Sequence, residues 1–293
     1  SPQKVKLIAQ KFKGVIGTTS IDEILNDETI AGVFVSATPS SHFEIASKII
    51  KSGKALFIEK PPCLCIEELN SLIAKQRLYG YNTVVVGMQK RFSPITTILR
   101  KKLRDKRLIS YNLHYQVGLY PEGNELYDLF IHPIDLVTFL FGDAKILGVH
   151  KTSSENGGKT YLLMLEHNNV AGTLELSTFY SWQEAHEAIC INMESGMYDM
   201  QQMETLTFTP SSPSFGKIPI EKVFARDSRL NSLYSRNNFN PILINNQIIS
   251  QGYFNEIKTF VESVECINKS TIPTDFTSLY VTYEILDKLD KIK

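Results

Sequence analysis

The fold of this chain is decided by three short segments, GVFVSAT (residues 32–38), ALFIE (55–59) and TVVVGMQ (83–89). Each is an apolar run rich in β-branched residues, which is typical of a strand buried on both faces of a parallel sheet. Between them, apolar residues follow helical spacing over residues 40–53 and 66–79. Strand, helix, strand, helix, strand predicts βαβ units and a doubly wound parallel sheet, the α/β class.

The sequence changes character after residue 90, where short runs alternate apolar and polar residues as half-solvated strands do. Polar turns such as Asn168-Asn169 join these runs, which indicates an antiparallel sheet. We therefore expect residues 1–90 to form a partial doubly wound domain and residues 91–293 an α+β domain with an open, mostly antiparallel sheet. Helices are predicted over residues 94–104, 126–141, 252–266 and 275–291, and loops with short strands over 210–250.

Composition and charge exclude several classes of protein. The 31 Lys and Arg residues balance the 31 Asp and Glu residues, which argues against nucleic-acid binding. No apolar run reaches the about 18–20 residues that span a bilayer, and the polar N-terminus lacks a signal peptide's apolar segment. Cys63 and Cys65 are one residue too close for a metal-binding C-x-x-C pair, so we expect free thiols, no metal and a cytoplasmic location.

The first candidate site is Thr38-Pro39-Ser40-Ser41-His42, where a predicted strand ends and Ser40 can cap the next helix. Ligands of doubly wound sheets bind at the carboxyl ends of the strands, and helix N-termini attract anions. The position predicts a phosphate or ribose contact. The alternative is a capped turn with a surface histidine.

The other two strands also end in polar groups. Lys60, in Glu59-Lys60-Pro61, would hold its ammonium group in the crevice, where it could bind a hydroxyl or a phosphate or tune an acid. A solvated lysine before a turn is the alternative. Gln89 and Arg91 alternate with Lys90 and would point to the opposite face from it, although a polar exit from a strand also explains them.

The apolar helix predicted over residues 126–141 carries the most informative polar groups. Asp128, His132 and Asp135 share a stripe about 60° wide at the helical rotation per residue. Pro133 indicates a helix start nearby, so the stripe depends on Asp128 lying inside the helix. Buried carboxylates and imidazoles are costly unless paired or used, and an imidazole beside a carboxylate makes a tuned acid or base. We favour this role over a set that only caps and pins the helix.

These segments, taken in order, resemble the glucose-fructose oxidoreductase / inositol dehydrogenase / MocA-like family. The family's T-P-N-x-x-H is approximated by Thr38 to His42, with the histidine one position early. Its other motifs, E-K-P, G-x-x-x-R-F, D-x-G-x-H-x-x-D with L-x-G, and G-x-x-x-E-I-x-x-F, are met at Glu59–Pro61, Gly87–Phe92, Asp128–Gly142 and Gly252–Phe260.

The resemblance implies an oxidoreductase, using NAD or NADP, that interconverts a secondary alcohol and a ketone on a sugar, nucleotide-sugar or cyclitol. Residues 1–90 would then bind the dinucleotide, and residues 91–293 would bind substrate and form a homodimer or homotetramer. Implied cofactor contacts are Thr38, Pro39, Ser40, His42, Glu59, Lys60 and Gln89. Implied substrate contacts are Arg91, Asp128 and His132.

The resemblance also implies catalytic roles for Lys60, Asp128 and His132. His132 would exchange the hydroxyl proton, Asp128 would bind a hydroxyl or orient the imidazole, and Lys60 would lower the pKa of the alcohol. Phe130 stands where the family has a glycine, so we expect the pocket floor to be displaced or narrowed.

The family's first strand, its G-x-G-x-x-G turn and its second strand have no counterpart in these 293 residues. Because that turn carries the pyrophosphate site, we expect the sequence to be part of a longer protein. The alternative is a non-catalytic binding or scaffold protein that has lost its cofactor half-site. A third hypothesis is an isomerase or lyase that uses the acid/base set alone.

Overall fold

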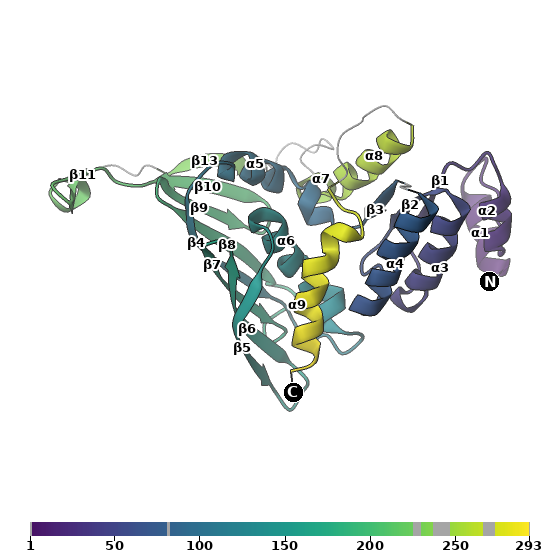
Figure 1. Ribbon diagram of the computed structural model, residues 1–293, viewed down its shortest axis with the longest axis horizontal. Helices are drawn as coiled ribbons and strands as arrows, with labels where there is room; N and C mark the ends of the chain where they lie inside the picture. The colour runs from purple at the N-terminus through teal and green to yellow at the C-terminus, as the bar shows by residue number, and fades with distance from the viewer. Residues whose placement is uncertain (1, 81–82, 225–229, 237–246, 266–272, 293) are drawn as a thin grey trace.

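The computed structural model describes residues 2–80, 83–224, 230–236, 247–265 and 273–292. Figure 1 shows a small α/β part beside a large twisted sheet, with helices between them. In chain order, the elements before the first strand of the large sheet are α1 (Pro2–Lys11), α2 (Ile21–Asn26), β1 (Gly32–Val35), α3 (Pro39–Ser52), β2 (Ala55–Ile58), α4 (Ile66–Tyr79), β3 (Val84–Val86), the 3₁₀ turn η1 (Gln89–Phe92) and α5 (Pro94–Leu103).

The second part contains most of the strands. Its elements are β4 (Leu108–Gln116), the π-helical turn η2 (Leu126–Phe130), α6 (Ile131–Phe141), β5 (Lys145–Ser153), β6 (Lys159–His167), β7 (Val170–Ser177), β8 (His186–Met193), β9 (Gly196–Gln201), β10 (Thr205–Pro210), β11 (Ser214–Phe215), β12 (Ile218–Pro219), η3 (Ile220–Lys222), β13 (Asn231–Ser235), α7 (Gln247–Ser250), α8 (Tyr253–Val264), η5 (Thr277–Leu279) and α9 (Tyr280–Asp290).

The three predicted N-terminal strands form a parallel sheet in the order β1-β2-β3, which confirms the α/β prediction. Leu56 and Ile58 of β2 join the main core with Ile49 of α3. Phe57, on the other face of β2, packs instead with Phe260 of α8, their ring centroids 5.9 Å apart. The C-terminal helix α8 therefore covers a face of the N-terminal sheet.

The turn after β1 differs from the prediction in its cap. Thr38, and not Ser40, is the N-cap of α3, and its side chain makes no capping hydrogen bond. Pro39 explains the difference, because its fixed φ and missing N–H suit the first position of a helix. Ser40 lies inside the first turn, and the helix ends as expected at Gly53, which has a φ of 80°.

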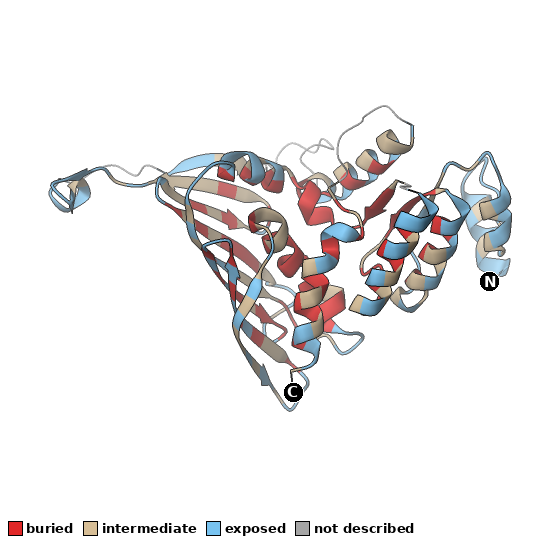
Figure 2. Ribbon diagram, viewed as in Figure 1, coloured by how far each residue is buried: buried red, intermediate tan, exposed pale blue. Residues whose placement is uncertain are grey.

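The large sheet has eight strands in the order β13-β10-β9-β8-β4-β7-β6-β5. All neighbours are antiparallel except β4 and β7, so the prediction of a mostly antiparallel sheet is confirmed. Asn168 and Asn169, both with positive φ, form the predicted two-residue turn between β6 and β7. One face packs against α6 and α9, where the buried residues gather in Figure 2. The other face exposes Leu162 and Met164 of β6.

The helix predicted over residues 126–141 is divided at residue 130. Residues 126–130 form the π-helical turn η2, and α6 follows with Pro133 in its first turn, where no backbone N–H is needed. Asp128 therefore lies outside α6. The prediction that Asp128, His132 and Asp135 share one stripe assumed a continuous α-helix, and the break at residue 130 removes that assumption.

Part of the segment predicted as loop with short strands, 225–229 and 237–246, lies outside the described residues. The rest includes β11 and β12, which form a small hairpin that projects from the sheet and is coloured exposed in Figure 2. No helix among the described residues could span a membrane. The described part also contains no metal-binding cluster of His, Cys, Asp or Glu side chains, and Cys63, Cys65 and Cys190 are free thiols.

Candidate active site

A cavity of about 300 Å³ lies where the carboxyl ends of β2 and β3 meet α6 and the large sheet. Lys60 follows β2, Gln89 and Lys90 belong to η1, and His132 comes from α6. The cavity is lined by Lys60, Gln89, Lys90, Tyr115, Val117, Asp128, Leu129, His132, Ala185, His186, Glu187, Gln202, Gln251 and Tyr253. Four predicted site residues are thus brought together: Lys60, Gln89, Asp128 and His132.

Lys60 is half-buried at the end of β2, and its Nζ donates a hydrogen bond to the backbone carbonyl of Asp128. Burial lowers the pKa of Lys60, while the carboxylates of Asp128 and Glu59 oppose this shift. A neutral acceptor therefore holds the Lys60 side chain at the cavity wall. Its remaining N–H groups are free to bind a ligand oxygen.

His132 is buried on α6, and its Nδ1 has no hydrogen-bond partner among the described residues. Burial holds the pKa of His132 well below its usual value, and the positive charges of Lys60 and Lys90 lower it further. The imidazole is therefore neutral near pH 7. A neutral imidazole in a cavity can accept a proton from a bound hydroxyl.

The Asp128 carboxylate turns towards its own loop. Its Oδ2 accepts hydrogen bonds from the Asn124 N–H at 3.0 Å and from the Tyr120 hydroxyl at 3.4 Å. The described structure has no hydrogen bond between Asp128 and His132, so the expected orientation of the imidazole by this carboxylate is absent. Asp128 lines the cavity and fixes the loop before η2.

Phe130 does not narrow the cavity. Its side chain is fully buried and packs edge-on against Tyr115 and Tyr161, with ring centroids 6.2 and 5.9 Å away. The ring lies in the core behind the cavity and is absent from the lining. The expected displacement of the pocket floor by this residue is not found.

Sequence reasoning missed the ion pair between Lys90 and Glu187. Both side chains are buried, both line the cavity, and the Lys90 ammonium lies 5.0 Å from the centre of the Tyr115 ring. We expected Gln89 and Lys90 on opposite faces, but η1 is a 3₁₀ turn and places both at the cavity. No local motif marks Glu187, which comes from β8 nearly a hundred residues later.

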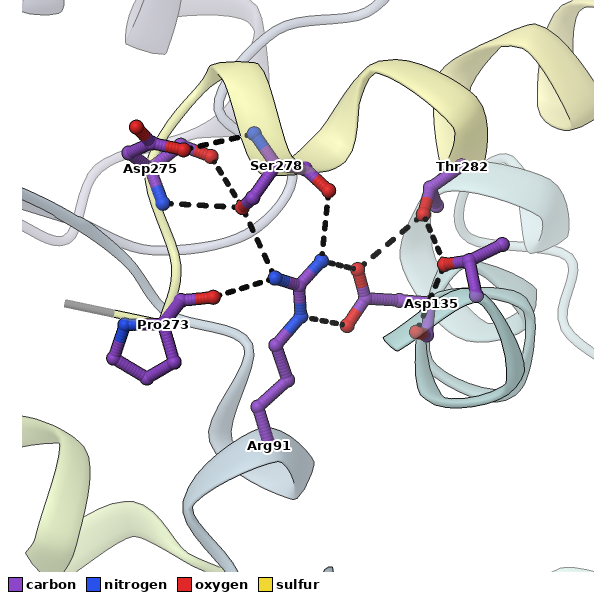
Figure 3. Close-up of polar contacts among 7 residues, drawn as sticks. Arg91, Asp135, Pro273, Asp275, Ser278 and Thr282 are labelled. Carbon is purple, nitrogen blue, oxygen red and sulfur yellow. Dashed lines mark hydrogen bonds and ion pairs between the residues drawn. The ribbon is translucent and has the colours of Figure 1, made fainter. Parts of the chain in front are cut away.

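Arg91, the expected substrate contact, does not line this cavity. Figure 3 shows its guanidinium held by the Asp135 carboxylate, which accepts from Nε at 2.8 Å and from Nη2. The Pro273 carbonyl accepts from Nη1 at 2.6 Å, and Ser278 accepts through both its hydroxyl and its carbonyl. Arg91 therefore ties η1 to α6 and to the turn before α9, and it has no donor left for a substrate.

The expected cofactor segment is divided in the same way. Thr38 and Ser40 are exposed at the start of α3, beside the end of β1. His42 is buried, its Nδ1 lying 2.7 Å from the Pro61 carbonyl and its Nε2 3.0 Å from the Ala37 carbonyl. The ring of His42 thus joins the turns that follow β1 and β2 and is not open to a ligand.

Part of the chain is similar in sequence to known proteins. Residues 1–87 match the family model described as an oxidoreductase family with an NAD-binding Rossmann fold. An inositol 2-dehydrogenase/D-chiro-inositol 3-dehydrogenase of Lactiplantibacillus plantarum is 27% identical over 140 residues, which is 45% of this chain and 40% of that protein. An uncharacterized oxidoreductase of Escherichia coli is 28% identical over 137 residues, 43% of this chain and 39% of that protein. The aligned part thus spans about two fifths of each relative.

Solved structures share the fold over nearly the whole chain. A dehydrogenase from Chromobacterium violaceum has a TM-score of 0.77 at 18% identity, covering 95% of this chain and 81% of that one. A UDP-N-acetylglucosamine 3-dehydrogenase from Acidithiobacillus ferrooxidans has a TM-score of 0.75 at 17% identity, covering 98% and 85%. Residues 1–87 are thus similar to the Gfo/Idh/MocA oxidoreductase family, and the chain shares its two-part fold with solved dehydrogenases.

Proposed function

We propose that the protein is an NAD(P)-dependent oxidoreductase that interconverts a secondary alcohol and a ketone on a sugar, nucleotide-sugar or cyclitol. The observation that carries this proposal is the meeting of Lys60 and His132 in one cavity at the carboxyl ends of the parallel strands. Ligands of doubly wound sheets bind at this edge. The inositol dehydrogenase and UDP-N-acetylglucosamine dehydrogenase relatives support the substrate class.

The residues at the strand ends fit a dinucleotide. Helix α3 begins at this edge, where the side chain of its N-cap residue Thr38 forms no capping hydrogen bond and Ser40 is exposed. Free N–H groups at a helix N-terminus favour phosphate. Glu59 and Gln89 follow the next two strands and would complete the contacts with Lys60 and Pro39. When bound, the nicotinamide would accept or supply the hydride.

His132 would take the hydroxyl proton as the alcohol is oxidised and return it in the reverse reaction. Its low pKa keeps it in the neutral form that this step needs. The ammonium group of Lys60 would stabilise negative charge on the substrate oxygen, because it lines the same cavity as His132 and has N–H groups left to donate. Asp128 and the Lys90–Glu187 pair would bind neighbouring hydroxyls.

We also propose that the open face of the large sheet pairs with a second copy, giving a homodimer or a homotetramer. Large apolar side chains on this face support the proposal, among them Leu162, Met164 and Ile109, which are 45%, 55% and 50% exposed. Exposed apolar patches commonly mark interfaces. A monomer in light scattering at micromolar concentration would contradict this assembly.

The proposed function is tested by polyol-dependent reduction of NAD⁺ or NADP⁺. Myo-inositol, D-glucose and UDP-N-acetylglucosamine would be offered in turn, and formation of reduced nicotinamide would be followed by its absorbance. We expect at least one substrate to be turned over with one of the two cofactors. Turnover or isomerisation of substrate without any nicotinamide would favour the cofactor-free isomerase or lyase hypothesis instead.

A further inference from the structure

A second and larger hollow lies on the other side of η1. It has a volume of about 730 Å³, is open to solvent, and is lined by residues of α5 and α8 and by Phe139 of α6. Arg91 and Phe92 form its inner wall, whereas Gln89 and Lys90 line the cavity with His132. A single turn of the chain therefore separates the two spaces, and they share no lining residue.

The charge of this hollow is unbalanced. Its basic side chains are Arg91, Arg100, Lys101, Arg104 and Lys258, and its acidic side chain is Glu262. Arg91 is neutralised by Asp135, and Lys258 lies 3.7 Å from Glu262. The other three cations, all contributed by α5 and the residue that follows it, form no ion pair within the described part of the chain.

Arg100 is held in place at this surface. Its guanidinium carbon lies 4.3 Å from the centre of the Phe139 ring, and that of Arg91 lies 4.8 Å from the same ring. Burial lowers the pKa of Arg100, and the charges of Arg91 and Arg104 lower it further, with no opposing carboxylate. The charge of Arg100 is thus destabilised by its neighbours, and a bound anion would relieve this.

Asp143 lines a neighbouring hollow with Arg100, but the described residues show no ion pair between them. The residues outside the described ranges include one acid, Asp227. Basic residues in a last helical turn are favoured by the helix dipole, which accounts for cations near the end of α5. The dipole does not account for their position around a concave surface backed by an aromatic ring.

We propose that this hollow binds a phosphate-bearing small molecule, at a site separate from the proposed dinucleotide site. Arginine guanidinium groups pair with phosphate oxygens through two parallel hydrogen bonds, and three uncompensated cations suit a ligand with more than one negative charge. Phe139 lies against the guanidinium groups of Arg91 and Arg100 and so helps to hold Arg100 at the hollow. The Asn255 amide donates one N–H to the Phe92 carbonyl and keeps a second N–H for the ligand.

The test is calorimetric titration with inorganic pyrophosphate at low ionic strength. We expect the wild-type protein to bind it and the double variant Arg100→Gln/Arg104→Gln to bind at least roughly tenfold more weakly. The matched control is Lys102→Gln/Lys106→Gln, which removes the same charge from neighbouring positions outside the hollow. Its affinity should remain close to that of the wild type.

Two results would overturn the site: no heat of binding at millimolar pyrophosphate, or equal weakening in the control, which would indicate a diffuse charge effect. Repeating the titration in the presence of NAD⁺ tests separateness. An unchanged affinity supports two sites, and competition would assign the hollow to the dinucleotide. Because the measurement uses no substrate, its outcome is independent of the proposed dehydrogenase activity.

Discussion

The two sides of η1 carry neighbouring cations that are buried in different ways. Lys90 faces the cavity and pairs with a single carboxylate, that of Glu187. Arg91 faces the packed side and binds Asp135, Pro273 and Ser278 together. A cation with spare donors beside a cavity can serve a ligand, whereas one whose donors are all used serves the fold. Hydrogen-bond saturation, and not residue type, separates the two roles.

The largest effect is expected on the cavity side, at His132. The variant His132→Asn keeps a polar side chain but cannot exchange a proton, so turnover should fall by about 10²–10⁴-fold while the melting temperature changes little. The control is His114→Asn, which alters a histidine paired with Glu175 outside the cavity. A near-normal rate for His132→Asn would remove the acid/base assignment.

On the packed side, Arg91→Met should damage the fold. It leaves the buried Asp135 carboxylate without its cationic partner, which typically costs about 3–5 kcal/mol of folding free energy. Urea unfolding measures this directly. Arg107→Met is the matched comparison, because its ion pair with Glu194 is exposed and should be worth about 0–1 kcal/mol. Similar losses in the two variants would show that Arg91 is not a structural anchor.

A third variant disturbs both sides of η1 at once. A Cβ atom on Gly252 would lie 1.9 Å from the Gln89 carbonyl oxygen, and its φ of 97° disfavours side chains. Gly252→Ala should therefore cost about 1–3 kcal/mol and also alter substrate affinity. Gly53→Ala, with a φ of 80° and open space around it, isolates the backbone part of that cost. If the two variants lose the same free energy of unfolding and Gly252→Ala leaves substrate affinity unchanged, Gly252 is not tightly packed against η1.

The last prediction concerns Glu256, where the effect depends on pH. Burial, and then the charge of Glu59, raise the pKa of Glu256 from 4.5 to about 9, and its Oε2 has no partner among the described residues. Between pH 4.5 and 9 the folded protein therefore keeps a proton on Glu256 that the unfolded chain releases. The free energy of unfolding is highest below pH 4.5 and falls as the pH rises towards 9.

Glu256→Gln removes this titration. Between pH 4.5 and 9, the free energy of unfolding of the variant should rise relative to that of the wild type by about 1.4 kcal/mol per pH unit. Unfolding curves at several pH values measure the difference, and Glu262→Gln, on the same helix but half-buried, is the control. A difference that does not vary with pH would mean that Glu256 is already ionised in the folded state.

Features of the fold that depend on neighbouring residues could be predicted from the sequence. The apolar runs ending at Val35, Ile58 and Val86 identified the parallel strands, and Lys60 was located because strand ends meet at one edge. The position of the helix cap could not be assigned from Ser40 alone, because Pro39 fixed the first position of α3.

Features that depend on distant partners could not be predicted. Arg91 donates hydrogen bonds to Pro273 and Ser278, which lie about 180 residues later in the chain. The residues next to Arg91 in the sequence do not indicate these partners. Lys90 meets Glu187 in the same way. The conformation of η1 decides whether Lys90 and Arg91 face the cavity or the packed side. The sequence of residues 87–92 alone does not distinguish a 3₁₀ turn from the end of a strand.

The position of α8 has a consequence for how the chain reaches its native state. The face of the N-terminal sheet formed by Phe57 and Val85 is covered by Phe260, about 200 residues later. During synthesis from the N-terminus, this face stays open until the last helices leave the ribosome. Such late, long-range contacts slow folding and expose the nascent chain to aggregation. Chaperone dependence during translation is therefore expected to be stronger than for a domain whose core closes locally.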